Sequence, residues 1–449
     1  MTAPQALDRL YLDHVAGLRR RYESVMAHHA VDAVVIHSGS LAKRSAFDDQ
    51  YWPLRPVPHW QHWVPLAEAD CALVVRPGAR PTLLRRLERS FWEKPPQAET
   101  SAFEDAFDVR PFEDAAEVRS FVGGGAHTAF VGDSAGLAAW GVEPSAANPT
   151  ELVAALDALR TIKTPYEIAC LAEANRRARA GHDALRETFR QSDRSELDLH
   201  LTYLRATAQD DWETPYKNIV AVGSHAATLH HVAYGRLAAK RDAESLLVDA
   251  GATCRGYCAD VTRTWVKGRG LAAAAFEQLV SGVDAMQLRL CGAVRVGASY
   301  EALHDEAHRQ TAVVLKEAGL VTTSLDEAVA SGVTHAFFPH GLGHSLGLQT
   351  HDVGCAMRAP RPDNAFLRNT TDVTVGQVFT IEPGIYFIAD LLEPLRAAPA
   401  GAGVDWHAVD AIAPLGGVRV EDDLHVVGGD PPLRNLTREH LPLGAGRVD

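Results

Sequence analysis

Residues 246–265, LLVDAGATCRGYCADVTRTW, decide how this chain folds. An apolar run ends at Asp249, and a second run with alternating side chains begins at Asp260. Gly256 lies between the two runs and permits a tight turn. We therefore predict an antiparallel hairpin that turns near Cys254, in which the two aspartates face each other and project on the same side of the sheet.

Two facing aspartates would destabilise a sheet, because like charges opposite each other repel. A cation between them turns this repulsion into a binding site. The alternative is a pair of solvated acids in a hairpin. Asp249 directly follows three apolar residues, 246–248, and that position is too buried for a solvated acid. The pattern therefore favours a metal site.

A histidine-rich string, PHGLGHSLGLQTHD, occupies residues 339–352 and contains His340, His344 and His351. Its proline and glycines exclude a helix, so it is not the helical HExxH zinc motif. In a chain with 21 histidines, the three could be a surface accident. Their setting among Pro, Gly and Leu instead indicates inward-facing side chains. We expect one metal ligand and two histidines that help in proton transfer or oxyanion stabilisation.

Two glutamates complete the set of candidate ligands. Glu382 lies in FTIEPGIYF (379–387), and Glu421 lies in GGVRVEDD (416–423). A glutamate inside an apolar strand is rarely buried without a partner, and Arg419 is one candidate partner. The presence of both glutamates beside the aspartate pair favours metal binding instead.

Four carboxylates and one imidazole form an oxygen-rich ligand set. Such a set suits two hard or borderline divalent ions better than one structural zinc ion. Two ions that share carboxylates generate a nucleophilic hydroxide near neutral pH. The five residues therefore predict a hydrolase.

The bulk properties of the chain narrow the function further. With 449 residues, 46% of them hydrophobic and 22% charged, we expect a folded protein of two domains. A net charge of −13 argues against a nucleic-acid or anionic-membrane partner, because both carry negative charge. No segment approaches the ~20 apolar residues that span a bilayer, and residues 1–26 lack the apolar core of a signal peptide.

The six cysteines are scattered along the chain, which fits a reducing cytoplasm. Only Cys254 and Cys258 are close together, and no second Cys or His pair near them completes a zinc site. We therefore expect a cytoplasmic protein in which this pair has a structural role.

The first part of the chain alternates helix and strand patterns. Residues 6–29 carry apolar side chains at helical spacing, and four apolar runs are typical of buried strands. These runs are residues 32–38, 71–78, 81–87 and 128–133. The alternation predicts an N-terminal α/β domain.

A strong helix start marks the second domain. Thr164 and Glu167 form a capping box, and Pro165 occupies the first turn. We therefore predict that residues 1–162 form the first domain and residues 163–449 the second.

The five strings, in this order, resemble those of the pita-bread metallopeptidases, a family that includes methionine aminopeptidase, aminopeptidase P and prolidase. Further strings resemble the bacterial Xaa-Pro dipeptidases, a subgroup that also contains organophosphorus acid anhydrolases. These strings are HSGSLAKRSAFDD, TPYKNIVAV, ATLHH, LGLQTHDVG and LRNTTDV. The resemblance implies an α+β chain, in which an N-terminal α/β creatinase-like domain with a mixed sheet precedes a pita-bread catalytic domain. In that second domain, helices cover a curved antiparallel sheet with the metals at its centre.

The resemblance also assigns a role to each candidate ligand. It implies two metal ions that Asp260 and Glu421 bridge. Asp249 binds one ion, while His344 and Glu382 bind the other. Glu382 is in addition the implied general acid/base for the attacking water.

Outside the ligands, the resemblance implies further histidines and substrate contacts. His230 and His351 would hold the scissile carbonyl and the tetrahedral intermediate, and His340 would support them in second line. Arg368 would grip the free carboxylate of a C-terminal proline. The remaining matching residues, which line the substrate pocket, are Arg419 and Tyr216.

Three positions depart from the usual pattern of these relatives. His231 stands where tyrosine is common, Thr350 where valine is common, and Thr371 where a second basic residue is common. The ligands are intact, so these departures concern the breadth of the pocket and the recognition of a carboxylate.

We therefore expect a homodimeric enzyme that hydrolyses Xaa-Pro dipeptides through a hydroxide bridging two divalent ions. Manganese is the expected metal, with cobalt, zinc or iron as alternatives. Three other functions stay open: phosphotriester hydrolysis as a main or side activity, non-catalytic binding on the same fold, and cleavage of longer peptides by an aminopeptidase P. The five intact ligands argue against the second, and the prolidase-like strings argue against the third.

Overall fold

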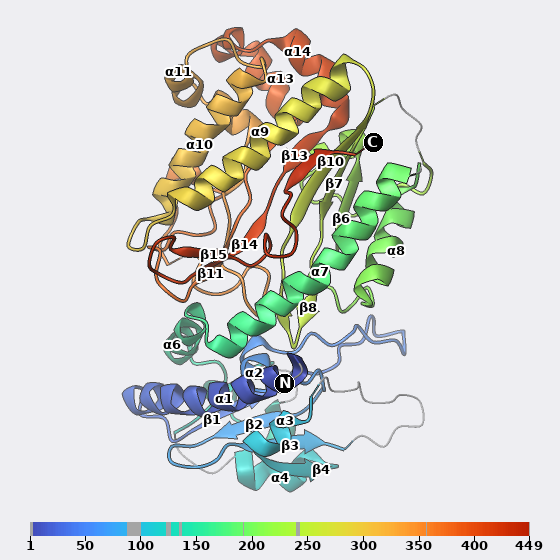
Figure 1. The fold of residues 1–449 in the computed structure, drawn as a ribbon. Coiled ribbons are helices and arrows are strands. Elements are labelled where there is room, and N and C mark those ends of the chain that lie inside the picture. Colours follow the sequence, from blue (N-terminus) through green and yellow to red (C-terminus); the bar gives the residue numbers. More distant parts are fainter. Residues whose placement is uncertain are drawn as a thin grey trace. The chain divides into compact units, whose positions relative to one another are not determined.

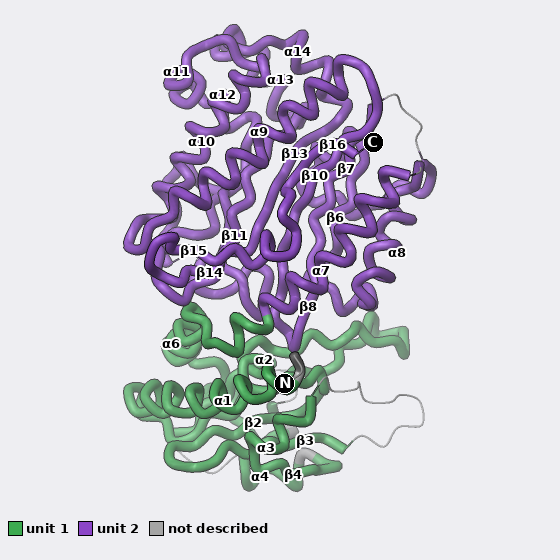
Figure 2. The backbone as a smooth tube through the Cα atoms, viewed as in Figure 1, with its two compact units in different colours: residues 1–170 green, residues 171–449 purple. Residues whose placement is uncertain are grey.

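The protein divides into two compact units, residues 1–170 and residues 171–449, which Figure 2 shows in different colours. The structure, a computed structural model, describes residues 3–87, 100–122, 127–133, 137–191, 193–238, 243–355 and 357–448. The division falls within α7 (Pro165–Gln191), the helix that the sequence placed at the start of the second domain. The predicted capping box forms there. The Thr164 backbone N–H donates to the Glu167 carboxylate at 2.8 Å, and the Glu167 N–H donates to the Thr164 hydroxyl at 3.4 Å.

Unit 1 is built on a mixed sheet whose described strands lie in the order β4-β3-β2-β1-β5. The pairs β1–β2 and β2–β3 are antiparallel, whereas β1–β5 and β3–β4 are parallel. The strands are β1 (Ala33–His37), β2 (Ala72–Val75), β3 (Thr82–Arg86), β4 (Asp108–Phe112) and β5 (Thr128–Val131). Four of them fall within the runs that the sequence predicted.

The strand that the sequence did not predict is β4, which lies at the edge of this sheet. Its side chains are mostly exposed, and it contains Pro111, which is tolerated only where a strand needs no second partner. The helix predicted over residues 6–29 is α1, and its buried side chains include those of Tyr11, Leu18 and Tyr22. The helices of unit 1 before α7 are α1 (Ala3–His28), α2 (Pro58–Trp63), α3 (Ala102–Ala106), α4 (Ala115–Val122), α5 (Leu137–Trp140) and α6 (Thr150–Thr161).

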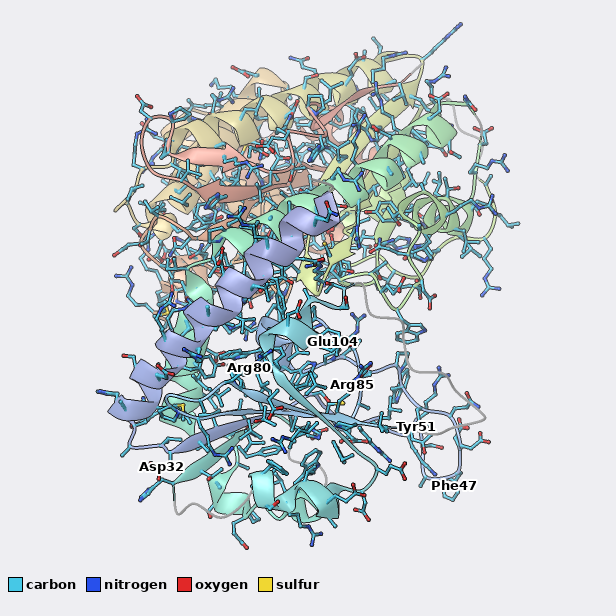
Figure 3. All side chains as sticks on the ribbon, turned by 60° about the horizontal axis from the view of Figure 1, so that its bottom comes forward. Asp32, Phe47, Tyr51, Arg80, Arg85 and Glu104 are labelled. Atoms are coloured by element: carbon cyan, nitrogen blue, oxygen red, sulfur yellow. The ribbon has the colours of Figure 1, made fainter. Side chains whose placement is uncertain are left out.

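The segment between β1 and α2 exposes large aromatic side chains. Phe47 is fully exposed and Tyr51 is 42% exposed, and both are labelled in Figure 3. The ammonium of Lys43 lies 6.0 Å from the centre of the Tyr51 ring, a weak cation–π contact at the surface. By contrast, Arg85 of β3 is held by an ion pair of 2.6 Å with Glu68.

Unit 2 contains all five predicted ligands on strands or beside them. Its described strands form groups in the orders β16-β10-β7-β6 and β11-β14-β15, with the further pairs β12–β13 and β8–β9. The longer strands are β6 (Ile219–Val222), β7 (Ala243–Asp249), β10 (Thr262–Gly268), β11 (Val378–Ile381) and β14 (Asp422–Val426). The shorter strands are β8 (Thr253–Cys254), β9 (Tyr257–Cys258), β12 (Gly384–Tyr386), β13 (Gly417–Arg419), β15 (Leu433–Asn435) and β16 (Ala445–Arg447).

Helices pack on these strands and supply the core of unit 2. Figure 1 shows α9 lying along the strands of unit 2, and its apolar residues pack against β10, β13 and β16. The described helices are α8 (Glu196–Thr207), α9 (Leu271–Ala293), α10 (Tyr300–Glu317), α11 (Leu325–Ala330), α12 (Val333–Phe337), α13 (Ala389–Ala397) and α14 (Trp406–Ile412). In the described part of the chain, no helix combines the length and the apolar character needed to cross a membrane.

The predicted hairpin forms, but its register differs from the prediction. Asp249 of β7 pairs with Thr262 of β10, not with Asp260. The residues between them fold into a smaller hairpin, β8–β9, which turns at Arg255 and Gly256. Both turn residues have positive φ, as a tight two-residue turn of this hand requires. Asp260 therefore precedes β10 instead of lying directly opposite Asp249.

Candidate active site

The strands bring the ligand candidates together in a row. In the backbone register, Asp249 lies beside Thr262, and Thr262 forms a bridge with Glu421 on its other side. The Glu421 N–H donates to the Thr262 carbonyl at 3.1 Å, and the Thr262 hydroxyl donates to the Glu421 carboxylate at 2.8 Å. Asp249 and Glu421 are therefore fixed by main-chain pairing on both sides of one residue.

The histidine-rich string is tied to β11 in the same way. The Thr380 N–H donates to the His344 carbonyl at 2.9 Å, and the His344 N–H donates to the Thr380 hydroxyl at 3.2 Å. The Glu382 N–H donates to the Leu342 carbonyl at 2.8 Å. The irregular backbone of this string therefore follows the strand, and this brings His344 and Glu382 to one place.

Four of the five predicted ligands meet around one imidazole nitrogen. His344 Nε2 lies 3.3 Å from Asp260, 3.6 Å from Glu382 and 3.8 Å from Glu421. Ligand atoms of Asp260, His344 and Glu421 lie close enough together to hold one metal ion. All of these side chains except that of Glu382 are buried.

The fifth predicted ligand, Asp249, joins the group through Tyr216 and Arg419. The Tyr216 hydroxyl lies 2.6 Å from Asp249 and 2.5 Å from Asp260. Arg419 donates to the other carboxylate oxygen of Asp249 at 2.5 Å. From the sequence, Arg419 was a candidate structural partner for a glutamate. In the structure, the carboxylate that Arg419 pairs with is that of Asp249.

Crowding of carboxylates in a buried site shifts their pKa values. Burial and the neighbouring carboxylates raise the pKa of Glu421 well above its usual range. Burial also raises the pKa of Glu382, to about 7, although His344 opposes this. The pKa of Asp260 is lowered instead, because hydrogen bonds from His344 and Tyr216 outweigh its burial. Burial lowers the pKa of His344, but the adjacent Asp260 and Glu382 raise it to about 9.

The residues present fit divalent cations. Glu421 Oε1 is buried and has no hydrogen-bond partner among the described residues. The single hydroxyl hydrogen of Tyr216 cannot serve both Asp249 and Asp260, so one of these two short contacts requires a proton or a cation nearby. A donor set of four carboxylates and one imidazole supplies the oxygen and nitrogen ligands that such ions take.

The predicted catalytic histidines lie around this group. The His351 ring is centred 4.4 Å from the His344 ring. His340 contacts the Tyr386 hydroxyl through Nε2 at 2.8 Å and the Gly341 carbonyl through Nδ1 at 2.8 Å. His230 is exposed, and it contributes to the lowered pKa of both His340 and His351, which burial dominates.

The predicted substrate contacts differ in their surroundings. Arg368 is exposed, and its Nη1 donates to His351 Nδ1 at 2.9 Å. Arg419 is buried and donates to Asp249, to the Tyr386 hydroxyl at 3.0 Å and to the Thr262 hydroxyl at 3.1 Å. Arg368 is thus available to a ligand in solvent, whereas Arg419 is committed to the site itself.

Sequence reasoning did not find several residues that support the site. Tyr386 connects His340 to Arg419 through its hydroxyl. It was missed even though it lies in the same string as Glu382. Asp423 accepts the backbone N–H of Asp260 at 3.1 Å, and its second neighbour along the chain is Glu421. Its position in the string VEDD was the only available signal.

Two of the departures from the family pattern have local explanations in the structure. The Thr371 hydroxyl donates to the Asn369 side chain at 2.8 Å within the segment that carries Arg368. His231 is buried and contacts Glu196 at 2.8 Å. The structure offers no account of Thr350.

Two stretches of the chain match known protein families. Residues 169–427 match metallopeptidase family M24, and residues 9–158 match the N-terminal domain of Xaa-Pro dipeptidases. The chain belongs to metallopeptidase family M24. Membership of this family implies divalent metal ions, for which the ligand set described above is suited.

Relatives of similar length match this family member almost from end to end. The Xaa-Pro dipeptidase of Marinobacter nauticus is 41% identical over 429 residues, which cover 95% of this chain and 97% of the relative. The Xaa-Pro dipeptidase of Xanthomonas campestris pv. campestris is 38% identical over 446 residues, or 98% of this chain and 99% of the relative. The predicted recognition and enzyme class are confirmed: the chain is an enzyme of the bacterial Xaa-Pro dipeptidase group of family M24.

Solved structures of the same fold include proline aminopeptidase P II from Yersinia pestis, with a TM-score of 0.71 at 22% identity, covering 95% of this chain and 96% of that one. Aminopeptidase P from Escherichia coli with the inhibitor Pro-Leu gives a TM-score of 0.71 at 22% identity, with 95% of both chains covered. At this identity the likeness concerns the fold, and it confirms the predicted α+β class with a pita-bread second domain.

Proposed function

We propose that this metal-dependent dipeptide hydrolase cleaves Xaa-Pro dipeptides into an amino acid and proline, with two divalent ions in its site. One observation carries the proposal: Asp260, His344 and Glu421 converge beside Glu382 and Asp249. The curated relatives that match nearly the whole chain are Xaa-Pro dipeptidases, which supports the substrate class.

The chemistry of the substrate explains why a dedicated site is needed. A peptide bond to proline is a tertiary amide, so an enzyme cannot grip it through an N–H of the leaving residue. A dipeptide offers instead a free amine, a carbonyl and a terminal carboxylate. Arg368 is an exposed guanidinium beside the ligand group, and its planar donors suit a carboxylate.

The implied ions would be held by the five predicted ligands, with Asp260 and Glu421 shared between them. When bound, such ions supply Lewis acidity, which activates water near neutral pH and polarises a carbonyl. The raised pKa values of Glu382 and Glu421 support this assignment, because positive charge is what an oxygen-rich buried cluster requires.

Glu382 is suited to the proton transfers of the reaction. Its carboxylate lies 3.6 Å from His344 Nε2, at the edge of the ligand group where an activated water would form. Its side chain is 17% exposed, so a substrate and water can reach it. In the proposed reaction it takes a proton from the attacking water and delivers it to the proline nitrogen as the peptide bond breaks.

The contacts of His351 define which of its nitrogens carries the proton. Arg368 can only donate hydrogen bonds, so His351 Nδ1 is the acceptor at 2.9 Å. Burial, His344 and Arg368 lower the pKa of His351 to about 4, which keeps the ring neutral at physiological pH. The proton of the neutral ring therefore lies on Nε2, where it is available to donate to a developing oxyanion.

His340 has a different part in the proposed mechanism. Its Nδ1 faces the Gly341 carbonyl, an acceptor only, so Nδ1 carries the proton and Nε2 accepts from the Tyr386 hydroxyl. Arg419 in turn donates to the Tyr386 oxygen at 3.0 Å. Both nitrogens of His340 are therefore engaged by the protein, which supports a second-line role that orients Tyr386 and Arg419.

A panel of substrates tests the proposal. Ala-Pro and Leu-Pro should be hydrolysed, whereas the tripeptide Ala-Pro-Ala should not, because Arg368 would lack a carboxylate at the proline. Efficient cleavage of the tripeptide would assign the chain to aminopeptidase P chemistry. A higher kcat/KM for paraoxon than for Ala-Pro would make phosphotriester hydrolysis the main activity.

Three finer properties stay predictions. Manganese is the expected metal, and metal analysis of the purified protein together with reactivation by different divalent ions tests it. A homodimer is expected, and light scattering tests it. A cytoplasmic location is expected from the scattered cysteines, and none of the six forms a disulfide in the structure.

A further inference from the structure

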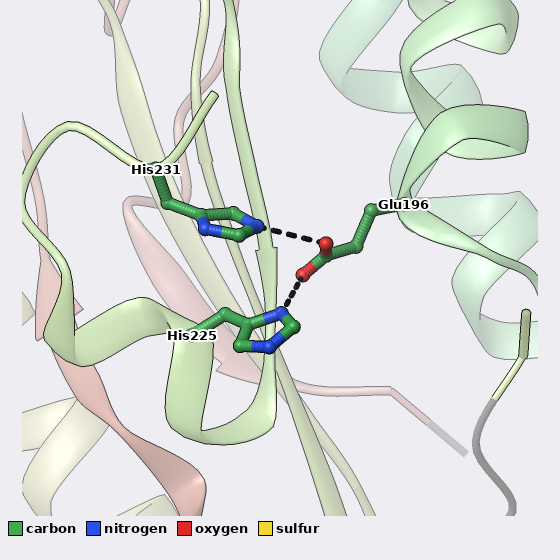
Figure 4. Close-up of side chains that lie close together, drawn as sticks. All are labelled: Glu196, His225 and His231. Atoms are coloured by element: carbon green, nitrogen blue, oxygen red, sulfur yellow. Dashed lines mark hydrogen bonds and ion pairs between the residues drawn. The ribbon is translucent and has the colours of Figure 1, made fainter. Parts of the chain in front are cut away.

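A second cluster of titratable side chains lies outside the predicted ligand set. Figure 4 shows its three members: Glu196 at the start of α8, His225 in the 3₁₀ helix Gly223–Ala227, and His231 in the loop that follows. Glu196 and His231 are buried, whereas the His225 side chain is 53% exposed. Their nitrogen and oxygen atoms lie close enough to hold a metal ion, so the cluster invites two explanations, a metal site or a hydrogen-bonded clamp.

The Glu196 carboxylate is fully occupied by N–H donors. Its Oε1 accepts from the Val222 backbone at 2.8 Å and from His225 Nδ1 at 2.8 Å. Its Oε2 accepts from His231 Nε2 at 2.8 Å and from the Gly235 backbone at 2.7 Å. Four donors satisfy the lone pairs of one carboxylate, and they leave none for a cation.

The geometry of the two imidazoles also favours the clamp. Their rings are stacked, with centres 4.5 Å apart and planes 29° from parallel. Stacked rings direct their nitrogens side by side toward the two carboxylate oxygens, whereas ligands of one ion must converge on a single point. The contacts of 2.8 Å are hydrogen-bond lengths, shorter than the 3.3–3.8 Å that separates His344 Nε2 from the carboxylates of the ligand group.

The pKa of Glu196 is consistent with an ionised clamp. Burial alone would raise it, but the backbone N–H groups of Gly235 and Val222, with the imidazoles of His231 and His225, lower it below its ordinary value. An ionised carboxylate accepts hydrogen bonds and donates none, which matches the four donors around it.

The four contacts lie on both sides of His230 in the chain, the histidine that the family resemblance places at the scissile carbonyl. Oε1 holds the chain at Val222 and His225, before His230, and Oε2 holds it at His231 and Gly235, after His230. His230 itself is exposed, and its ring makes no hydrogen bond within the described part of the chain. Its place is therefore determined by the backbone on either side of it.

We propose that Glu196 is a positioning residue of the active site, which clamps segment 222–235 through four hydrogen bonds and thereby fixes His230. The inference rests on the proposed function, because the action of His230 on the substrate carbonyl is part of it. It also gives His231 a role: at a position where relatives commonly have tyrosine, its Nε2 supplies one of the four donors.

A double-mutant cycle tests whether Glu196 acts through His230. Glu196→Gln replaces one carboxylate oxygen by an NH₂ group. This group cannot accept the hydrogen bonds that the two facing N–H groups donate. We expect it to lower kcat for Ala-Pro about 10- to 100-fold, as loss of a supporting partner typically does, with KM within about threefold of wild type. In a His230→Ala background the same change should lower kcat less than about twofold. An equal loss in both backgrounds would show that Glu196 does not act through His230.

The matched control is Glu187→Gln on α7. Glu187 is an exposed glutamate that pairs with Arg190 and contacts neither the segment 222–235 nor the ligand group. The Glu187→Gln variant loses the same charge as Glu196→Gln, but its kcat should equal that of the wild-type protein. A loss as large as that of Glu196→Gln would overturn the inference, because the net charge alone would then explain the effect.

Substitution of the two histidines separates the clamp from a metal site. Glutamine places an N–H where His231 has Nε2, and asparagine places one where His225 has Nδ1, but neither amide is a strong metal ligand. The inference predicts that His231→Gln retains kcat within about threefold, whereas His231→Leu shows the loss seen with Glu196→Gln. His225→Asn and His225→Leu should differ in the same sense. If zinc analysis found a third ion per chain that His231→Gln and His225→Asn both release, the cluster would be a metal site and the clamp would be wrong.

A readout without turnover keeps this inference separate from the proposed function. Backbone hydrogen exchange of residues 222–235 should be at least about tenfold faster in Glu196→Gln than in wild type, while exchange in α9 is unchanged. Unchanged exchange in 222–235 would overturn the clamp even in an active enzyme. Absence of Ala-Pro hydrolysis by wild-type protein with accelerated exchange in the variant would overturn the proposed function and leave the clamp as an anchor of this loop.

Discussion

Arg368 Nη1 donates to His351 Nδ1 at 2.9 Å, so the predicted carboxylate-binding residue and a predicted catalytic histidine share one hydrogen bond. The two residues lie 17 positions apart in the chain, on segments that the sequence treated as separate strings. Binding of the substrate carboxylate at Arg368 would therefore act on the residue that also fixes the tautomer of His351. In the proposed function, this contact would couple recognition of the free C-terminus to preparation of the oxyanion donor.

Replacement of Arg368 by alanine should raise KM for Ala-Pro about 10- to 100-fold, because a hydrogen bond to a charged group contributes about 1.5–3 kcal/mol. It should also lower kcat, because His351 loses the donor at Nδ1. The C-terminal amide of Ala-Pro lacks the carboxylate, so its KM should be the same for variant and wild type. Arg179→Ala is the control, since Arg179 is an exposed arginine of α7 that pairs with Asp183. An unchanged KM for Ala-Pro in Arg368→Ala would remove the carboxylate-binding role.

Substitution of Glu382 by glutamine should lower kcat at least about 10³-fold, because the amide neither takes nor delivers a proton. The fold should be retained, since Glu382 makes its backbone contact to Leu342 through its own N–H, which the variant keeps. Circular dichroism and metal analysis should accompany the rate measurement. Turnover near the wild-type rate with metal bound would contradict the proton-transfer role.

The contribution of Glu382 to the stability of chelated protein should decrease as the pH rises. Glu382 has a pKa of about 7 in the folded protein against an ordinary value of 4.5, so folding favours its protonated form. This contribution is fully present below the unfolded-state pKa and is lost as the pH rises through about 7, at a cost of about 3 kcal/mol. Urea unfolding in chelator at about pH 5 and about pH 7.5 measures it. The free energy of unfolding of the wild-type protein minus that of Glu382→Gln should decrease between the two pH values, and added manganese should stabilise the wild-type protein mainly at the higher pH.

The hydrogen bonds of the Tyr386 hydroxyl to His340 and Arg419 predict that its removal lowers kcat while the ligand group still binds metal. Tyr386→Phe removes the hydroxyl that donates to His340 and accepts from Arg419. We expect kcat for Ala-Pro to fall about tenfold, with the metal content unchanged, because neither partner is a proposed ligand. Tyr51→Phe is the control, since Tyr51 is exposed in unit 1. A variant with wild-type kcat would show that this hydrogen-bonded chain has no part in the reaction.

The candidate ligands could be predicted from the sequence because each is a polar residue within or beside an apolar strand, where burial without a partner is rare. Glu421 after VRV and Asp249 after LLV are examples, and both lie buried in the structure. The register predicted for the β7–β10 hairpin was wrong, because residues 253–258 form a hairpin of their own. That turn could not be separated from the larger one by composition alone.

The supporting contacts were beyond sequence reasoning for a different reason. Asn175 donates to Asp423 at 2.7 Å across 248 positions, and Glu196 meets His231 across 35. Neither pair has a local pattern, because the partners come together only when α7 or α8 packs beside the strands. Sequence reasoning found residues whose own setting is unusual, and it missed those whose role depends on a distant partner.

The most direct test of the central claim is hydrolysis of Ala-Pro by chelator-treated protein that is titrated with manganese, with bound metal measured at each point. We predict no turnover without metal and a rise in rate that ends at two bound ions per chain. A variant that lacks Asp260, Asp260→Ala, should bind fewer ions and remain inactive. Full turnover in the chelated protein, or none at two bound ions, would contradict a hydrolytic site that depends on two metal ions.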